Sequence, residues 1–225
     1  MVSAEQLSSE AVARRSAGRA VRQLGHALIG HDADEELLTN VAVTLGALTD
    51  RLDTGTPRSR PIEQVGHRET ATTDRGTAIE SYDDRPFSGT ASPWGLDLEV
   101  HRIGDEIEAS VTLGAAHEGA PGRAHGGIVA GLFDDVFGFV LGVIQRPAFT
   151  GELKVRYERP TPLHRPLLCR GRLVSQHGRK LTIDGELIDP DGGADVVVAR
   201  GVGLFITVDP ELFAQTMELP PPPSG

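Results

Sequence analysis

The stretch PGRAHGGIVAGLFDDVFG, residues 121–138, decides the fold. Large apolar residues there and just beyond cover most of a helical cylinder, so the sequence predicts one helix over residues 127–145, buried almost all round. Glycine inside a helix costs roughly 1 kcal/mol relative to alanine. Several glycines on one stripe therefore indicate that another group approaches the helix closely there. The stripe, at 3.6-residue spacing, comprises Gly127, Ala130, Gly131, Asp134 and Gly138.

Segments of alternating apolar and polar residues flank this helix. Two precede it, residues 96–100 and 107–113, with Gly104-Asp105 as a hairpin turn between them. Four more follow, over residues 152–158, 167–176, 180–188 and 194–208, separated by short turns. Short links of this kind favour an antiparallel sheet, and the apolar helix must then pack on one face of it.

The rest of the chain differs in composition. Residues 1–54 are predicted as a helical extension, with Ser3 as a helix cap and a second helix over residues 33–52. Residues 55–91 are predicted as a linker, residues 92–209 as the main domain and residues 210–225 as a tail. The second helix has an apolar face made of Leu37, Leu38, Val41, Leu45 and Leu48. The basic run of Arg14, Arg15, Arg19 and Arg22 is interpreted as a solvated helix face rather than a ligand or membrane patch.

Composition and motif searches exclude several classes of function. A net charge of −10 argues against broad nucleic-acid binding, and a single cysteine, Cys169, fits a reducing cytoplasm without a disulfide framework. No run of 18 apolar residues and no signal peptide is recognised, so no membrane span is expected. The eight histidines lack metal-ligand spacing, and no nucleotide-binding loop or serine-hydrolase elbow occurs. Cys169 is interpreted as a small core residue rather than a nucleophile.

Polar groups on the central helix suggest chemistry. Gly126 and Gly127 open the helix, where free N–H groups and the dipole can stabilise an oxyanion on an acyl carbonyl. Asp134 could activate water or attack directly, or it could be an ordinary surface acid. It lies seven residues beyond Gly127, about 10 Å along the axis. One helix cannot easily aim both groups at one carbonyl, so the sequence favours a composite site between two symmetry-related subunits.

His125-Gly126-Gly127 followed by Asp134 resembles the helix motif of PaaI-type hot-dog acyl-CoA thioesterases, and the resemblance extends over residues 92–208. It implies an α+β hot-dog fold, in which about six antiparallel strands wrap around one long helix. It also implies that Gly126 supplies the oxyanion N–H, that His125 positions the thioester carbonyl and that Asp134 is the general base or nucleophile. Thr150 matches a Ser/Thr position that orients the attacking water, although a threonine that merely starts a strand would look the same.

Several expectations follow from that resemblance. The substrate is an acyl-CoA, with coenzyme A as part of the substrate and neither cofactor nor metal. The assembly is a homodimer or a dimer of dimers. Gly127 and Arg123 are expected to bind substrate, while Arg123, Arg156, Arg159 and Arg165 could meet the CoA phosphates or be exposed strand charges. Relatives carry an amide side chain where this chain has Gly119, which changes carbonyl polarisation. Rival functions are hydration or dehydration of an acyl thioester, and acyl-CoA binding without catalysis.

Overall fold

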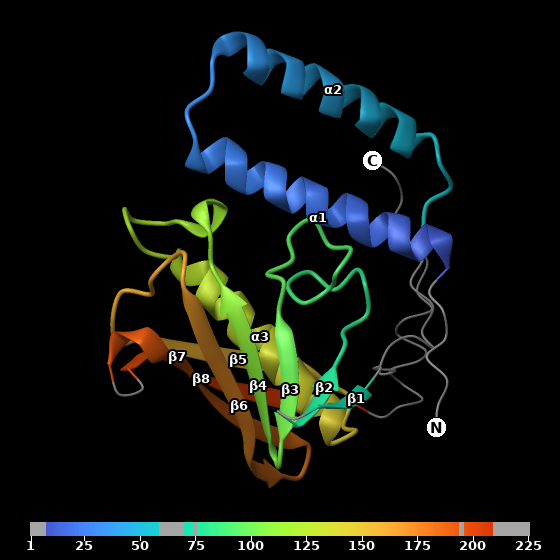
Figure 1. Cartoon of the computed structure of the whole chain (residues 1–225). Coiled ribbons are helices and arrows are strands. Elements are labelled where there is room, and N and C mark those ends of the chain that lie inside the picture. Colours follow the sequence, from blue (N-terminus) through green and yellow to red (C-terminus); the bar gives the residue numbers. More distant parts are fainter. Residues whose placement is uncertain (1–7, 59–69, 74–75, 194–195, 209–225) are drawn as a thin grey trace.

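The computed structural model describes residues 8–58, 70–73, 76–193 and 196–208, and it shows one curved antiparallel sheet around a central helix (Figure 1). The helices are α1 (Ser9–Gly30), α2 (Glu35–Asp53) and α3 (Gly126–Val143), and short 3₁₀ turns are η2 (Ala115–His117) and η3 (Pro190–Gly192). The strands are β1 (Thr70–Thr73), β2 (Gly76–Ile79), β3 (Glu99–Ile103), β4 (Glu106–Thr112), β5 (Ala148–Tyr157), β6 (Pro166–His177), β7 (Lys180–Asp189) and β8 (Val196–Thr207).

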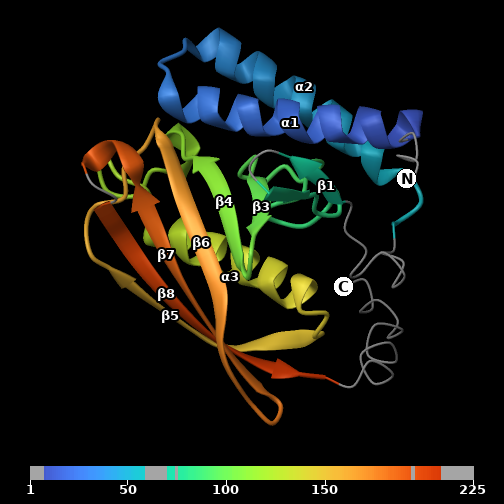
Figure 2. The ribbon, with the colours of Figure 1, turned by 60° about the horizontal axis from the view of Figure 1, so that its bottom comes forward.

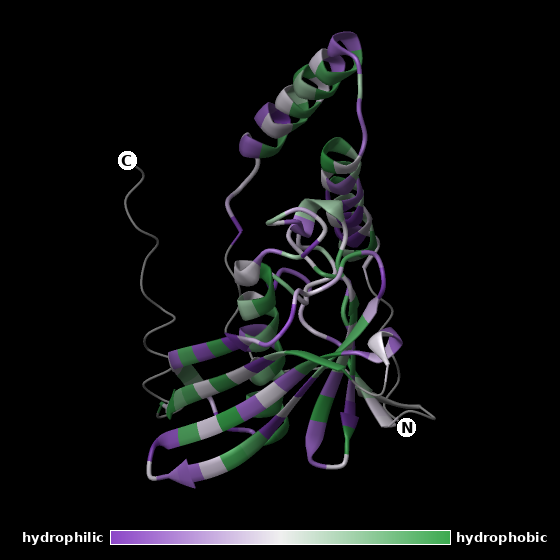
Figure 3. Cartoon of the chain, turned by 90° about the vertical axis from the view of Figure 1, so that its left-hand side faces the viewer, coloured by the Kyte–Doolittle hydropathy of each residue, from purple (hydrophilic) through white to green (hydrophobic). Residues whose placement is uncertain are grey.

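The eight strands lie in the order β1-β2-β3-β4-β6-β7-β8-β5. The predicted turns form the hairpins, and Gly104 and Gly178 adopt the positive φ angles of 62° and 59° that favour glycine. Alternating residues of β4 are buried, and the same banding of polar and apolar residues runs along the longer strands in Figure 3. β5 pairs with β8 rather than with β6, the next strand in the chain, so β5 forms one edge of the sheet.

α3 lies across the concave face of the sheet, as Figure 2 shows, and begins and ends within two residues of its predicted bounds. Its buried side chains join those of the strands in one core, where Phe133, Phe137 and Phe205 are fully or almost fully buried and in ring contact. By length and hydropathy α3 would also pass as a membrane-spanning helix, with half of the segment buried inside this chain. The sheet that wraps it explains this apolar composition.

The segment predicted as a linker, residues 55–91, is instead partly built into the sheet. β1 and β2 extend it beyond β3, and the connection from β2 to β3 (residues 80–98) then runs back over α3. A Cβ at Gly131 would collide with the ring of Phe87, and one at Gly138 with the guanidinium of Arg85. The close approach predicted from the glycine stripe therefore occurs, and the approaching group is this connection. The strands β1 and β2 were missed because segments of four residues leave little periodicity.

The N-terminal helices form as predicted, and the two differ in how closely they pack against the rest of the protein. Ser8 caps α1, whereas Ser3 and the tail, residues 210–225, lie outside the described residues. α1 docks on the β2–β3 connection: Arg22 is buried and pairs with Asp97, while Arg15 pairs with Asp83 at 2.6 Å. The basic run is thus only partly a solvated face. α2 stands apart from the sheet (Figures 1 and 3) and has no buried residue, so its predicted apolar face is half-buried or exposed.

Candidate active site

His125 is the N-cap of α3. Its Nδ1 accepts a hydrogen bond from the N–H of Gly127 at 3.0 Å, and its extended backbone (φ −66°, ψ 135°) leads the chain into the helix. A ring nitrogen that accepts carries no proton, so the neutral imidazole bears its proton on Nε2. The exposed His125 ring therefore offers a donor. Contrary to the prediction, the Gly127 N–H is not free, because the His125 side chain caps it.

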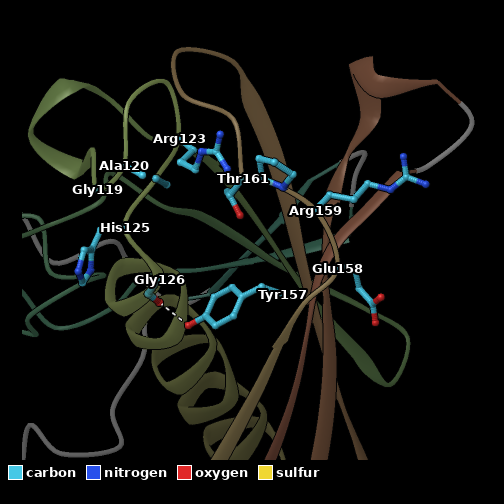
Figure 4. Close-up of a pocket in the computed structure, with 11 residues that line it drawn as sticks. Gly119, Ala120, Arg123, His125, Gly126, Tyr157, Glu158, Arg159 and Thr161 are labelled. Atoms are coloured by element: carbon cyan, nitrogen blue, oxygen red, sulfur yellow. Dashed lines mark hydrogen bonds between the residues drawn. The ribbon is translucent and has the colours of Figure 1, made fainter.

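Gly126, the first residue of α3, has the free donor instead. Its N–H has no acceptor among the residues that the structure describes, as expected for the first turn of a helix. Its carbonyl accepts from the hydroxyl of Tyr157 on β5 at 2.7 Å (Figure 4). A Cβ at position 126 would come within 3.0 Å of that hydroxyl, so glycine allows the close approach. Tyr157 was not singled out as a site residue because the contact spans 31 residues.

A pocket of about 450 Å³ opens at this end of α3. Its walls come from the loop before the helix and from the segment that follows β5, as Figure 4 shows, and include His125, Gly126 and Tyr157. Two cations, Arg123 and Arg159, also line it, and neither forms an ion pair with any described residue. The other two candidate arginines are engaged: Arg156 pairs with Glu158, and Arg165 with the buried Asp189. The pocket thus combines a free N–H with uncompensated positive charge.

Asp134 lies two turns further along α3 and faces the edge strand β5. Its side chain is exposed and accepts a hydrogen bond from the hydroxyl of Thr150 on β5 at 2.9 Å. The next residue, Asp135, is buried instead, and its Oδ1 lies 2.6 Å from Nε of Arg85. Asp134 is eight residues beyond Gly126, a rise of about 12 Å at 1.5 Å per residue. Within one chain, the carboxylate and the free N–H are therefore too far apart to act on one carbonyl.

The loop before α3 departs from the pattern of the resembled enzymes at Gly119. A Cβ at this position would lie 2.8 Å from the Cα of His125, so the amide side chain found in relatives has no room here. Glu118, beside it, accepts from the N–H of Gly122 and closes the loop. The N–H of Gly126 and the ring of His125 are thus left as the donors near the helix start.

Cys169 lies on β6, is fully buried in the core, and burial raises the pKa of its thiol far above the ordinary value. A thiol that stays protonated is a poor nucleophile, which confirms its interpretation as a core residue. Within the described ranges no group of three histidine, cysteine, aspartate or glutamate side chains could hold a metal ion.

Comparisons with known proteins agree with this architecture. Residues 121–195 match the sequence family described as the thioesterase superfamily. The crystal structure of protein RHA08564, a thioesterase superfamily protein, superposes with a TM-score of 0.69 and 29% identity over 86% of this chain and 94% of that one.

Two mammalian relatives are each named acyl-coenzyme A thioesterase THEM4. The bovine protein (Bos taurus) is 31% identical over 120 residues, and the mouse protein (Mus musculus) 29% over 121 residues. Both alignments cover 52% of this chain, which spans about half the length of these relatives. The matched family region contains the α3 motif and the strands β5, β6 and β7. The chain thus has the hot-dog fold that its resemblance to PaaI-type enzymes implied, and its residues 121–195 are similar to the thioesterase superfamily.

Proposed function

We propose that this protein hydrolyses an acyl-CoA thioester to a free carboxylic acid and CoA. The observation that carries the proposal is the unpaired N–H of Gly126, which belongs to a residue lining the pocket at the positive end of the α3 dipole. A thioester carbonyl bound there would receive this N–H and the Nε2–H of His125. Both donors are fixed before substrate arrives, the arrangement that stabilises a developing oxyanion most effectively.

The second part of the proposal is that Asp134 comes from a neighbouring subunit. β5 is the edge strand, ten residues long, and its outer edge has no partner within the described part of the chain. A long exposed edge is a template for pairing with another strand. A second copy related by a two-fold axis perpendicular to the sheet beside β5 would pair its β5 antiparallel to this one and bring its Asp134 and Thr150 toward the start of this α3. We propose a homodimer on this basis, alone or as half of a dimer of dimers.

In the proposed reaction, the carboxylate of Asp134 removes a proton from water while Thr150 helps to orient the attacking oxygen. The water oxygen bonds to the carbonyl carbon, and the oxyanion forms against Gly126. The C–S bond then breaks, CoA leaves as a thiolate and is protonated, and the acid is released. Direct attack by Asp134, followed by hydrolysis of the anhydride, gives the same products and uses the same residues.

The CoA moiety is proposed to bind through Arg123 and Arg159, because both line the pocket and neither forms an ion pair with a described residue. Guanidinium groups bind phosphate oxygens through paired charge-assisted hydrogen bonds. Gly127 supports the site indirectly by fixing the tautomer of His125. The proposed location remains the cytoplasm, where a lone buried thiol such as Cys169 stays reduced.

The test is release of free thiol from a panel of acyl-CoAs that includes short, long and aromatic acyl groups. We expect the wild type to release CoA and Asp134→Ala to show no measurable turnover while keeping its circular dichroism and melting temperature. Asp134 is exposed, so truncation leaves no buried cavity. Wild-type hydrolysis by the variant would contradict the assigned role. Binding without thiol release, or conversion of an enoyl thioester to its hydroxyacyl form, would instead support one of the two rival functions.

A further inference from the structure

We propose that Arg85 is a positioning residue, which holds the turn of α3 that carries Asp134 in its working orientation. This inference rests on the proposed function, because it assumes that Asp134 takes part in hydrolysis. Arg85 belongs to the β2–β3 connection, 50 residues before Asp135 and outside the region that matches the thioesterase superfamily. Nothing in the family motif therefore points to it.

The contact between Arg85 and α3 is specific. The Nε of Arg85 lies 2.6 Å from Oδ1 of Asp135, and its Nη2 donates to the backbone carbonyl of the same residue at 3.0 Å. The guanidinium also lies 5.1 Å from the ring centre of Phe139. The side chains of Arg85 and Asp135 are only 13% and 6% exposed. Arg85 thus binds both the side chain and the backbone carbonyl of Asp135.

Two glycines of α3 leave the space that this contact with Arg85 needs. Gly131 and Gly138 lie on the same face, one turn before and one turn after Asp135, and a Cβ at either would overlap Phe87 or Arg85. The β2–β3 connection therefore packs Phe87 and Arg85 against the helix, and Arg85 also pairs with Asp135 there. The close fit fixes the rotation of α3 about its own axis more firmly than an apolar contact would.

Asp134 precedes Asp135 and, at 3.6 residues per turn, points about 100° away from it around the helix. Its carboxylate is held by Thr150 of β5. The same turn is therefore anchored on one side by Arg85 and on the other by Thr150. A displacement of about 1 Å at a reacting group can reduce a rate by about 100-fold, so loss of either anchor should affect turnover more than binding.

The experiment compares Arg85→Gln with Arg15→Gln in the full-length protein. Arg15 forms a similar ion pair, at 2.6 Å to Asp83, with the same connection but from α1, without contact to α3. We expect Arg85→Gln to lower kcat by about 10- to 100-fold with little change in KM, and Arg15→Gln to leave both near wild type. Arg85→Lys keeps the charge but cannot make both bonds to Asp135, so we expect it to recover only part of kcat.

A second measurement separates this inference from the proposed function. The carboxyl ¹³C resonance of Asp134, assigned by its absence in Asp134→Asn, should shift in Arg85→Gln and stay in place in Arg15→Gln. If it does not move and kcat is that of the wild type, the positioning role is wrong even when Asp134 is essential. If Asp134→Asn keeps full turnover, the role assigned to Asp134 in the proposed function fails, and the resonance alone decides whether Arg85 orients Asp134.

Should Arg85→Gln fail to fold, the double variant Arg85→Met/Asp135→Leu replaces the ion pair with apolar groups and leaves no buried charge unpaired. A folded double variant with wild-type kcat and an unchanged Asp134 resonance would overturn the inference. A folded double variant with reduced kcat, unchanged KM and a shifted resonance would support it.

Discussion

At the scale of single residues, the start of α3 shows why glycine stands at position 126. The residue combines an N–H with no acceptor among the described residues, a carbonyl that accepts from Tyr157, and a position where a Cβ would lie 3.0 Å from that hydroxyl. Each of these properties serves the proposed carbonyl site, and only the first could be anticipated from the sequence. Position 126 is also the first helical residue, where the N–H has no role in the helix itself.

That position allows the N–H to be removed without breaking the helix. Proline is favoured at the first helical residue, and His125 already has the extended backbone that a following proline requires. We expect Gly126→Pro to lower kcat by about 10²–10³-fold, the usual effect of losing one oxyanion donor. Gly126→Ala, which adds a Cβ but keeps the N–H, is the control for crowding against Tyr157, and we expect it to retain most activity. Equal losses in both variants would argue against the oxyanion role.

At the scale of elements, α1 touches the loop that carries the site. Nδ1 of His26 on α1 accepts from the N–H of Ala116 at 3.0 Å, and its ring lies 4.6 Å from that of His117. Nδ1 of His117 accepts in turn from the N–H of Gly114, and its carbonyl accepts from the N–H of His125. Both rings must be neutral to act as acceptors. The N-terminal extension is therefore tied to the loop before α3 by one proton-sensitive hydrogen bond, from Ala116 to His26, and by the contact between the rings of His26 and His117.

Stability should depend on pH through this pair. Burial, with a smaller contribution from His26, lowers the pKa of His117 from 6.5 to about 4. Burial also lowers the pKa of His26, aided by nearby His164 and Arg22 and opposed by Asp97. The unfolded chain binds protons more readily than the folded one, so the stabilisation is complete above pH 6.5 and is lost as the pH falls from 6.5 toward 4.

Thermal melts between pH 7.5 and 4.5 measure this effect. We expect the melting temperature to fall across that interval, and to fall less steeply in His117→Asn, which keeps an acceptor that does not titrate. His177→Gln, at the exposed end of β6, should keep the wild-type slope. Parallel slopes for the wild type and His117→Asn would show that this contact does not control the pH dependence.

At the scale of the whole molecule, one chain holds all the proposed parts but cannot bring them together. The free N–H and the carboxylate are separated by about 12 Å along one rigid helix. β5 carries both Thr150 and Tyr157 and forms the exposed edge of the sheet. Pairing of two copies along that edge is the simplest way to complete the site, and it makes activity a property of the assembly.

Complementation between two inactive variants tests this arrangement. In a dimer of Asp134→Asn with Gly126→Pro, one of the two composite sites is intact, because its N–H and carboxylate come from different subunits. Random assembly of equal amounts therefore restores about a quarter of the wild-type sites, and heterodimers selected through two different tags carry about half. We expect co-expressed variants, purified through two different tags, to regain hydrolysis that neither has alone. If each site lay within one subunit, every site would keep one defect and no activity would return.

Much of this organisation was determined locally by the sequence. The 3.6-residue and two-residue periods predicted α3, the hairpins and the close approach to the glycine stripe, and the family motif pointed to His125, Gly126 and Asp134. Only the tertiary structure showed that residues 70–73 and 76–79 join the sheet, that α1 docks through Arg22, and that Arg85 binds Asp135 and Tyr157 binds Gly126. Periodicity reports how each segment divides between core and solvent. It does not report which distant partner a polar group meets, since that depends on how the whole chain folds back on itself.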